Sequence, residues 1–296
     1  MQRSNDDAIE DPVVAPDSLA APVTSATRTL SAGPSARQRQ QKDKRVSGVV
    51  LAVLSFAIVI TVWWVLASLI LKNESLLPTP PAVVQAFWED LLNGSLWKNT
   101  WASLQRVFIG FLIGVVTAIP VGLLLGWYRI VRGLAEPWIQ FFRVIPPIAI
   151  IPLVIVYLGI GEPAKIFLIW FSAFLTIVIS VYGGMRSIDA TLIRAGRVLG
   201  AKDIDMFLDI AVPATIPFIF VGMRLGLAAA WSTLVAAELI ASSEGLGFLI
   251  IQSGQFRDLA RVLLGIIIIG LIGLVMDRVI LFLDKKLTHW QEREDR

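Results

Sequence analysis

The stretch VSGVVLAVLSFAIVITVWWVLASLIL, residues 46–71, contains no charged side chain over 26 residues. At 1.5 Å per residue, a helix of this length is about 39 Å long, which exceeds the roughly 30 Å of a bilayer's hydrocarbon core. An uninterrupted apolar run of this length is typical of a membrane span. We therefore expect the stretch to cross a membrane as a helix.

Further apolar runs of similar length follow along the chain. We expect five more membrane-crossing helices, over residues 107–128, 138–157, 166–185, 213–241 and 259–283. These runs are continuously apolar, whereas the strands of a membrane β-barrel alternate apolar and polar residues over about ten positions. The predicted fold class is therefore all-α, a polytopic membrane protein with six transmembrane helices.

The composition also indicates a membrane protein rather than a soluble enzyme. Of the 296 residues, 56% are hydrophobic and 17% are charged, whereas about 25% are charged in a typical soluble domain. The chain has no cysteine and one histidine, His289. Disulfides, thiolate metal sites and cysteine nucleophiles are thereby excluded, and little remains for acid–base chemistry. We expect no catalytic residue, no metal site and no cofactor.

The positions of Lys and Arg predict the orientation, because cytoplasmic segments carry an excess of both. With a cytoplasmic N-terminus, the inner segments hold sixteen of these residues and the outer segments six. The six outer residues are Lys72, Lys98, Arg106, Lys165, Arg257 and Arg261. We therefore expect both termini in the cytoplasm.

Three regions are expected along the chain. Residues 1–45 have too few large apolar side chains to bury and are predicted to be a disordered cytoplasmic tail. Residues 46–285 form the six-helix domain, and residues 286–296 form a cytoplasmic C-terminal tail. In the first outer loop, residues 79–91 follow a proline-rich start with apolar residues at helical spacing, which predicts a short amphipathic helix. This helix either anchors the chain at the outer membrane surface or contacts an external partner.

Glycine pairs at four-residue spacing recur within the expected helices. They are Gly110/Gly114, Gly122/Gly126 and Gly222/Gly226. Such pairs allow helix backbones to approach closely inside a membrane, and they predict a compact bundle without indicating any particular function.

The segment between the fourth and fifth expected helices, residues 187–213, is a cytoplasmic insertion with helical patterning. Its apolar stripe consists of Leu192, Ala195, Val198 and Leu199. Gly200 is expected to end a first helix, and Asp203 to begin a second that runs to Pro213. Two short helices joined by a sharp turn fit a groove on a soluble partner.

This segment resembles the coupling loop (EAA loop) of ABC importer permeases, in which a glycine is followed ten residues later by Ile-x-Leu-Pro. Here Gly200 is followed by Ile210-Ala-Val-Pro213, with valine in the place of leucine, and Arg194-Ala195-Gly196 replaces the opening Glu-Ala-Ala. The resemblance implies contact with an ATPase. The coupling residues it implies are Arg194, Ala195, Gly196, Gly200, Ala201, Ile210 and Pro213.

Roughly residues 50–290 resemble the taurine, sulfonate and nitrate branch of these permeases, and taurine permeases most closely. The matching segments include WSTLVAAELIA at 231–241, GLGF at 245–248 and QSGQF at 252–256. The resemblance implies a type I ABC importer permease fold (MetI-like) in a bacterial inner membrane, with taurine or an aliphatic sulfonate as cargo. Nitrate, bicarbonate or another small solute is the alternative cargo.

The same resemblance implies the partners. They are a cytoplasmic ABC ATPase dimer, a periplasmic substrate-binding protein, a second permease copy and membrane lipid, and no nucleic acid is expected. No Gly-x-x-x-x-Gly-Lys-Ser/Thr sequence occurs in the chain, so ATP hydrolysis is expected on a separate polypeptide. A secondary transporter or channel is the alternative of a different class.

Arg224 and Glu238 interrupt the fifth expected helix. A charge at the bilayer centre costs at least about 2.5–3.5 kcal/mol, so it is expected to face protein or water. Either each residue pairs with a neighbouring helix, or their shared face lines the translocation path and Arg224 attracts an anion. With Trp231, these are the candidate pathway residues. Arg143, at the expected inner start of the third helix, is predicted to extend to the membrane surface.

Overall fold

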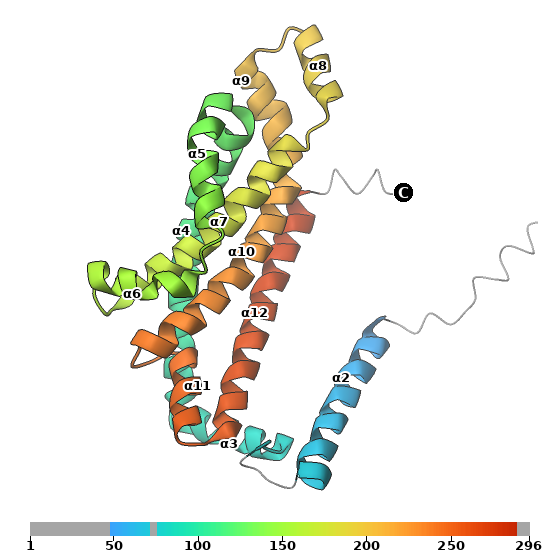
Figure 1. The fold of residues 1–296 in the computed structure, drawn as a ribbon. Coiled ribbons are helices and arrows are strands. Elements are labelled where there is room, and N and C mark those ends of the chain that lie inside the picture. The colour runs from blue at the N-terminus through green and yellow to red at the C-terminus, as the bar shows by residue number, and fades with distance from the viewer. Residues whose placement is uncertain (1–47, 72–75, 289–296) are drawn as a thin grey trace, which may run out of the picture. The chain divides into compact units, whose positions relative to one another are not determined.

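The computed structural model describes residues 48–71 and 76–288, in which every regular element is a helix (Figure 1). These helices are α2 (Gly48–Val65), η1 (Leu66–Leu71), α3 (Pro80–Leu92), α4 (Ser95–Trp127), α5 (Arg129–Phe142), α6 (Pro147–Leu158), α7 (Glu162–Arg186), α8 (Ala190–Val198), α9 (Asp203–Asp205), η2 (Met206–Ala211), α10 (Val212–Ala241), α11 (Leu246–Gln255) and α12 (Leu259–Leu287). The predicted tail at residues 1–45, His289 and the rest of the C-terminal tail from there onward lie outside the described residues.

The chain divides into two units, Met1–Leu54 and Ser55–Arg296. Within the first unit the structure describes residues 48–54, which form the first turns of α2, and their side chains from residue 50 onward are exposed. The second unit contains the remaining helices and all of the packing and sites described below.

Five helical segments are long and apolar enough to cross a membrane. They are Val50–Leu71, Ser95–Trp127, Glu162–Arg186, Asp203–Ile240 and Leu259–Leu287. These segments correspond to the first, second, fourth, fifth and sixth helices expected from the sequence. The all-helical membrane fold is therefore confirmed, with a sixth span if the bent pair α5 and α6 is counted as one.

The expectation of one continuous helix over residues 138–157 is wrong. Helices α5 and α6 meet at a bend of 99°, and α6 runs across the direction of α5 in Figure 1. Pro146 and Pro147 cause the break, because a residue that precedes proline is driven out of the helical region and proline has no N–H to donate. Arg143 therefore lies at this bend, where it caps α5, and not at the start of a helix.

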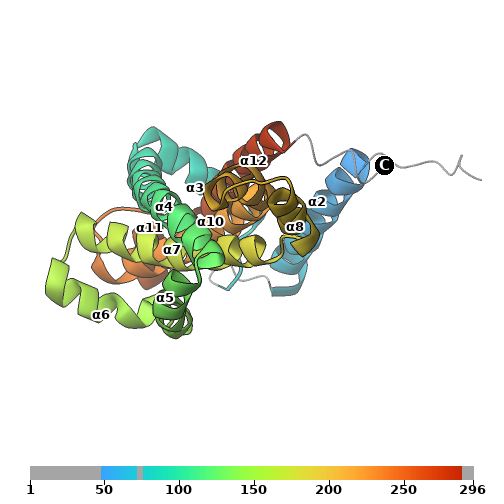
Figure 2. The same ribbon diagram turned by 90° about the horizontal axis from the view of Figure 1, so that it is seen from above.

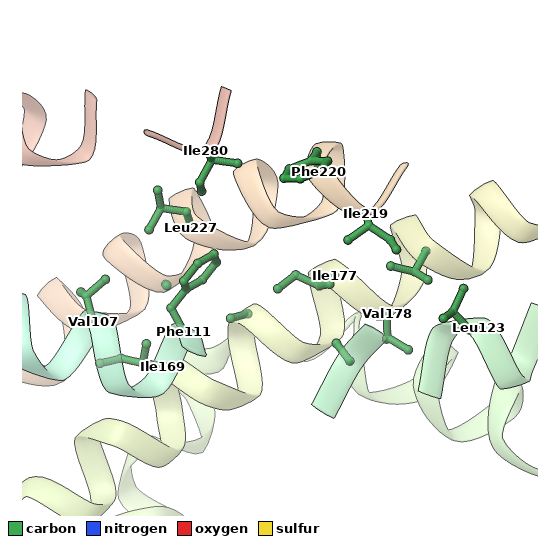
Figure 3. Packing of buried hydrophobic residues seen from close by; sticks show 14 of the residues in the cluster. Val107, Phe111, Leu123, Ile169, Ile177, Val178, Ile219, Phe220, Leu227 and Ile280 are labelled. Atoms are coloured by element: carbon green, nitrogen blue, oxygen red, sulfur yellow. The ribbon is translucent and has the colours of Figure 1, made fainter. Parts of the chain in front are cut away.

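Helix α7 is the centre of the core. It packs along α4 on one side and along α10 on the other, as the two views in Figures 1 and 2 show. Figure 3 shows apolar side chains of α4, α7 and α10 packed together, with Ile280 of α12 beside them. Lipid gives helices no hydrophobic reason to associate, so this interdigitated packing is what stabilises their contact.

All three predicted glycine pairs lie where α4 or α10 packs closely against α7. A Cβ atom on Gly122 of α4 would lie 2.7 Å from the Cβ of Val181 on α7. A Cβ atom on Gly226 of α10 would lie 2.6 Å from Cγ1 of Ile177, also on α7. The predicted close approach of the helices is thus confirmed at both contacts.

Substituting Gly226→Ala is expected to lower the free energy of unfolding by about 1–3 kcal/mol, because the new methyl group overpacks the α7–α10 contact. Gly183→Ala is the matched control, since its Cβ meets nothing within 4 Å and alanine favours a helix over glycine by about 1 kcal/mol. Thermal unfolding of the detergent-solubilised proteins measures the stability of the two variants. Equal unfolding temperatures would contradict the packing described for α7 and α10.

Candidate functional site

Helix α8 begins directly after α7, at a capped N-terminus. The carboxylate of Asp189 accepts a hydrogen bond from the backbone N–H of Thr191 at 2.7 Å, which satisfies one of the free donors of the first turn. This hydrogen bond holds the pKa of Asp189 below its ordinary value. The cap gives α8 a defined start outside the membrane-crossing segments.

Gly200 ends α8 as the sequence predicts. Its φ of +82° is left-handed, a conformation that glycine adopts without strain. The N–H of Ala201 donates to the carbonyl of Gly196 at 3.0 Å, and the N–H of Gly200 donates to that of Arg197, also at 3.0 Å. This pair of bonds is the Schellman arrangement, which turns the chain sharply at the helix end.

Helix α8 packs back onto η2 through a small residue. Gly196 is buried, and a Cβ atom there would lie 3.1 Å from Cδ1 of Ile210 and 3.5 Å from Cγ of Met206. The structure therefore brings together two residues of the expected coupling motif, Gly196 and Ile210, although fourteen positions separate them in the sequence.

The other faces of α8 are open. Leu192, Val198 and Leu199 are 51%, 87% and 86% exposed, and we call these three residues the α8 patch. Arg194 and Arg197 are exposed beside it. Contiguous exposed apolar side chains with a polar rim are typical of a protein–protein contact.

The expectation that the second helix of the segment stops at Pro213 is wrong. Helix α9 continues through the π-helical turn η2 into α10, and Pro213 lies in the first turn of α10. The N–H of Val212 bonds to the carbonyl of Phe207, five residues earlier, so the wider turn leaves room for a proline that has no N–H of its own. The part of the segment from Asp203 onward and α10 thus form one continuous helix.

The same segment is tied to α4. The ring of Phe207 in η2 lies 5.6 Å from the ring of Trp127 and 6.2 Å from that of Tyr128, at the C-terminal end of α4. Trp127 Nε1 also donates to Asp203 Oδ2 at 3.2 Å. Residues 203–211 therefore contact the end of α4 and are continuous with α10.

A second site lies toward the opposite end of the bundle, where α4, α7, α10 and α11 meet. Its centre is Arg106 of α4, whose side chain is 3% exposed. Its Nε and Nη2 donate to the two carboxylate oxygens of Glu162 at 2.6 and 2.7 Å. Its Nη1 donates to Glu238 Oε1 at 2.6 Å and to the carbonyl of Glu244 at 2.8 Å.

Glu238 of α10 is fully buried in the same cluster. Besides Arg106, it accepts hydrogen bonds from Ser103 Oγ at 2.8 Å and from the backbone N–H of Gly247 at 2.8 Å. Ser103 Oγ in turn accepts from the N–H of Leu246 at 2.8 Å. We call Ser103, Arg106, Glu162 and Glu238 the Arg106 network. Its residues join α4, α7 and α10 through charge-assisted bonds, and the N–H groups of Leu246 and Gly247 attach α11 to it.

The other two candidate pathway residues also have defined surroundings. Arg224 Nε donates to Asp277 Oδ1 of α12 at 2.7 Å. Trp231 is buried in the core, and its Nε1 has no hydrogen-bond partner among the described residues. Both charged residues of α10 therefore pair with a neighbouring helix, and a role in the pathway stays a prediction for all three.

Comparison with known families identifies the chain. The family described as "Binding-protein-dependent transport system inner membrane component" matches residues 110–289, which include the coupling segment and most of the core. The chain belongs to this family. It is a permease component of the ABC importer type, a transport subunit and not a catalytic enzyme.

Several curated proteins are similar to this permease over most of their length. A probable ABC transporter permease protein of Brucella abortus is 50% identical over 251 residues, which are 85% of this chain and 99% of that protein. The taurine transport system permease protein TauC of Escherichia coli is 36% identical, over 82% of this chain and 90% of that protein. The nitrate import permease protein NrtB of Synechocystis is 31% identical, over 83% of this chain and 91% of that protein.

The fold of the permease also matches that of a solved transporter. One inward-facing form of the MetNI methionine ABC transporter is 25% identical with a TM-score of 0.50, and covers 61% of this chain and 93% of that chain. A second inward-facing form is 24% identical with a TM-score of 0.52, and covers 64% of this chain and 98% of that chain. The MetI-like fold expected from the sequence is thereby confirmed.

Three residues expected in outer segments, Arg106, Lys165 and Arg261, lie inside α4, α7 and α12. Arg106 and Lys165 are buried, and the two carboxylates of Glu162 and Glu238 balance their charges. The signal was present in Glu238, because a carboxylate inside an apolar helix needs a cation from another helix.

Proposed function

We propose that this permease is driven by a separate ATPase that binds residues 187–213. The observation that carries this proposal is the exposed α8 patch, because α8 packs on η2, and η2 is continuous with α10 and in ring contact with α4. In this arrangement the ATPase contacts α8, and Gly200 sets the direction of the turn behind it. The contact between Gly196 of α8 and Ile210 of η2 transmits the movement of α8 to η2. The remaining residues of the proposed coupling segment are Arg194, Ala195, Ala201 and Pro213.

The wider assembly is part of the same proposal. Two permease copies form the transport unit, a binding protein delivers the cargo, and membrane lipid surrounds the remaining surface. Large exposed apolar side chains on the bent pair support this, among them Trp138, Val156 and Tyr157 at 64%, 78% and 79% exposure, because a membrane protein covers such side chains with lipid or with another subunit. Closure of the ATPases pulls the coupling segments and opens the pathway between the copies.

The proposed location is the bacterial inner membrane, with both termini in the cytoplasm. The excess of Lys and Arg in the predicted inner segments supports this orientation. It places α8 and η2 on the cytoplasmic side, where ATP is available, and the Arg106 network toward the outer side. A tail at 1–45, a domain at 46–285 and a second tail at 286–296 remain the proposed division of the chain.

The proposed cargo is a small organic anion, with taurine or an aliphatic sulfonate first. Two kinds of relative support it: the taurine permease of Escherichia coli and a putative aliphatic sulfonates transport permease protein of Bacillus subtilis, which is 34% identical over 86% of this chain. The nitrate permease of Synechocystis supports nitrate as the competing cargo.

A strain that lacks the permease is expected to lose growth on taurine or an alkanesulfonate as the sole sulfur source and to regain it when the gene is supplied on a plasmid. Growth on sulfate is the control, because sulfate does not depend on this importer. Unimpaired growth on sulfonates together with lost use of nitrate would overturn the sulfonate assignment and leave the permease assignment intact.

A further inference from the structure

A cavity of about 480 Å³ lies beside the bend between α5 and α6. Its wall includes Arg143 after α5, Ser172, Thr176 and Ser180 of α7, and Leu225 and Ala229 of α10. Ser172 and Thr176 lie ten and fourteen residues into the membrane-crossing helix α7, so the cavity is about midway along that helix. Its volume is in the range of small-molecule sites.

Arg143 is the only charged residue of this wall. Its side chain is exposed. Among the described residues, no carboxylate pairs with its guanidinium and none forms a hydrogen bond with its side chain. An unpaired charge is not stable against hydrocarbon at this depth, so water, a second subunit or a passing anion must solvate it. Arg224 differs, because Asp277 already neutralises it.

The remaining wall suits an anion with a short apolar body. Ser172, Thr176 and Ser180 are spaced by four residues and therefore share one face of α7. The hydroxyls of Thr176 and Ser180 donate to backbone carbonyls at 2.9 Å, whereas that of Ser172 makes no hydrogen bond with the described residues. One free hydroxyl and one free guanidinium thus stand opposite apolar side chains from α10.

We propose that this cavity is a contact site for the anionic head group of the cargo within the permease, with Arg143 as the residue that binds it. The proposal rests on the proposed function in that the cargo is a small anion. A guanidinium donates two parallel hydrogen bonds to a sulfonate or carboxylate, and Ser172 supplies a third donor. A single cation without a surrounding cage lets the anion leave as readily as it enters.

The test uses introduced cysteines, because the natural chain has none. Thr176→Cys and Leu225→Cys, made separately, place a thiol on the α7 wall and on the α10 wall. Membrane vesicles that carry the assembled importer are treated with anionic 2-sulfonatoethyl methanethiosulfonate or with its cationic trimethylammonium counterpart. The ratio of the two modification rates reports whether the cavity attracts anions, whichever cargo the importer carries.

Adding Arg143→Gln is expected to lower the anion-to-cation rate ratio about tenfold at both cysteines, whereas Arg143→Lys keeps most of it. Arg129→Gln is the matched control, because it removes the same charge from the far end of α5 and is expected to leave the ratio unchanged. A ratio that does not respond to Arg143→Gln would overturn the proposal, as would cysteines that neither reagent modifies, with or without trapped nucleotide.

This outcome is independent of the growth experiment. A lower anion-to-cation rate ratio in Arg143→Gln would support the site. If the strain that lacks the permease also grew normally on sulfonates, the importer would carry a different anion. An unchanged ratio with sulfonate-dependent growth would retain the proposed cargo and remove Arg143 from its path.

Discussion

Replacing Arg106 by methionine is expected to lower the free energy of unfolding by about 3–5 kcal/mol, because it leaves the buried charge of Glu238 without a cation. Ser103 and Gly247 still donate hydrogen bonds to Glu238, but neither carries a charge. Thermal unfolding of the detergent-solubilised permease and the amount of protein found in the membrane measure the effect.

The control for this variant is Lys98→Met in the same helix. Lys98 pairs with Glu244 at 3.2 Å, but its side chain is 68% exposed, so the expected change is at most about 1 kcal/mol. The double variant Arg106→Met/Glu238→Gln removes both buried charges and is expected to recover part of the loss, as a double-mutant cycle would show. Equal effects of Arg106→Met and Lys98→Met would contradict the network described here.

Replacing Gly200 by valine is expected to reduce ATP-dependent uptake at least tenfold while leaving the membrane helices folded. A β-branched residue at a φ of +82° costs about 1–2 kcal/mol, and a chain that relaxes this strain turns α8 away from η2. A Cβ atom on Gly200 meets nothing within 4 Å, so the effect is one of backbone conformation rather than crowding.

Gly200→Asn is the matched control, since asparagine tolerates the left-handed conformation and is expected to retain most of the uptake. Leu199→Asp tests the α8 patch itself without a backbone change, and we expect it to weaken copurification of the ATPase. Normal uptake and normal ATPase stimulation in both Gly200→Val and Leu199→Asp would remove residues 187–213 from the ATPase contact.

Patterns that depend on neighbouring residues predicted most of this fold. Apolar runs located five of the membrane-crossing helices, and the glycine pairs located the contacts of α7. The short helix expected after the first membrane-crossing segment is α3, which Thr79 and the two prolines after it begin as expected. In each case the physical cause lies within a few positions along the chain.

The errors have two kinds of cause, one local and one distant along the chain. The third helix breaks at Pro146 and Pro147, so the local effect of the two prolines outweighs the apolar run around them. The Arg106 network depends on a pairing with Glu238, 132 positions away, which no count of charges along the chain can detect. For Arg224 the sequence left two alternatives, pairing with a neighbouring helix or contact with an anion, and it could not supply the partner Asp277, 53 positions away.

Reconstitution into liposomes tests the central claim most directly, that this chain transports cargo only when a separate ATPase drives it. Taurine uptake is measured for the permease alone, with proton or sodium gradients of either direction, and for the permease with its ATPase, its binding protein and ATP. We predict no uptake above protein-free liposomes in the first case and uptake in the second that stops when ATP hydrolysis is blocked. Gradient-driven uptake by the permease alone would contradict the account.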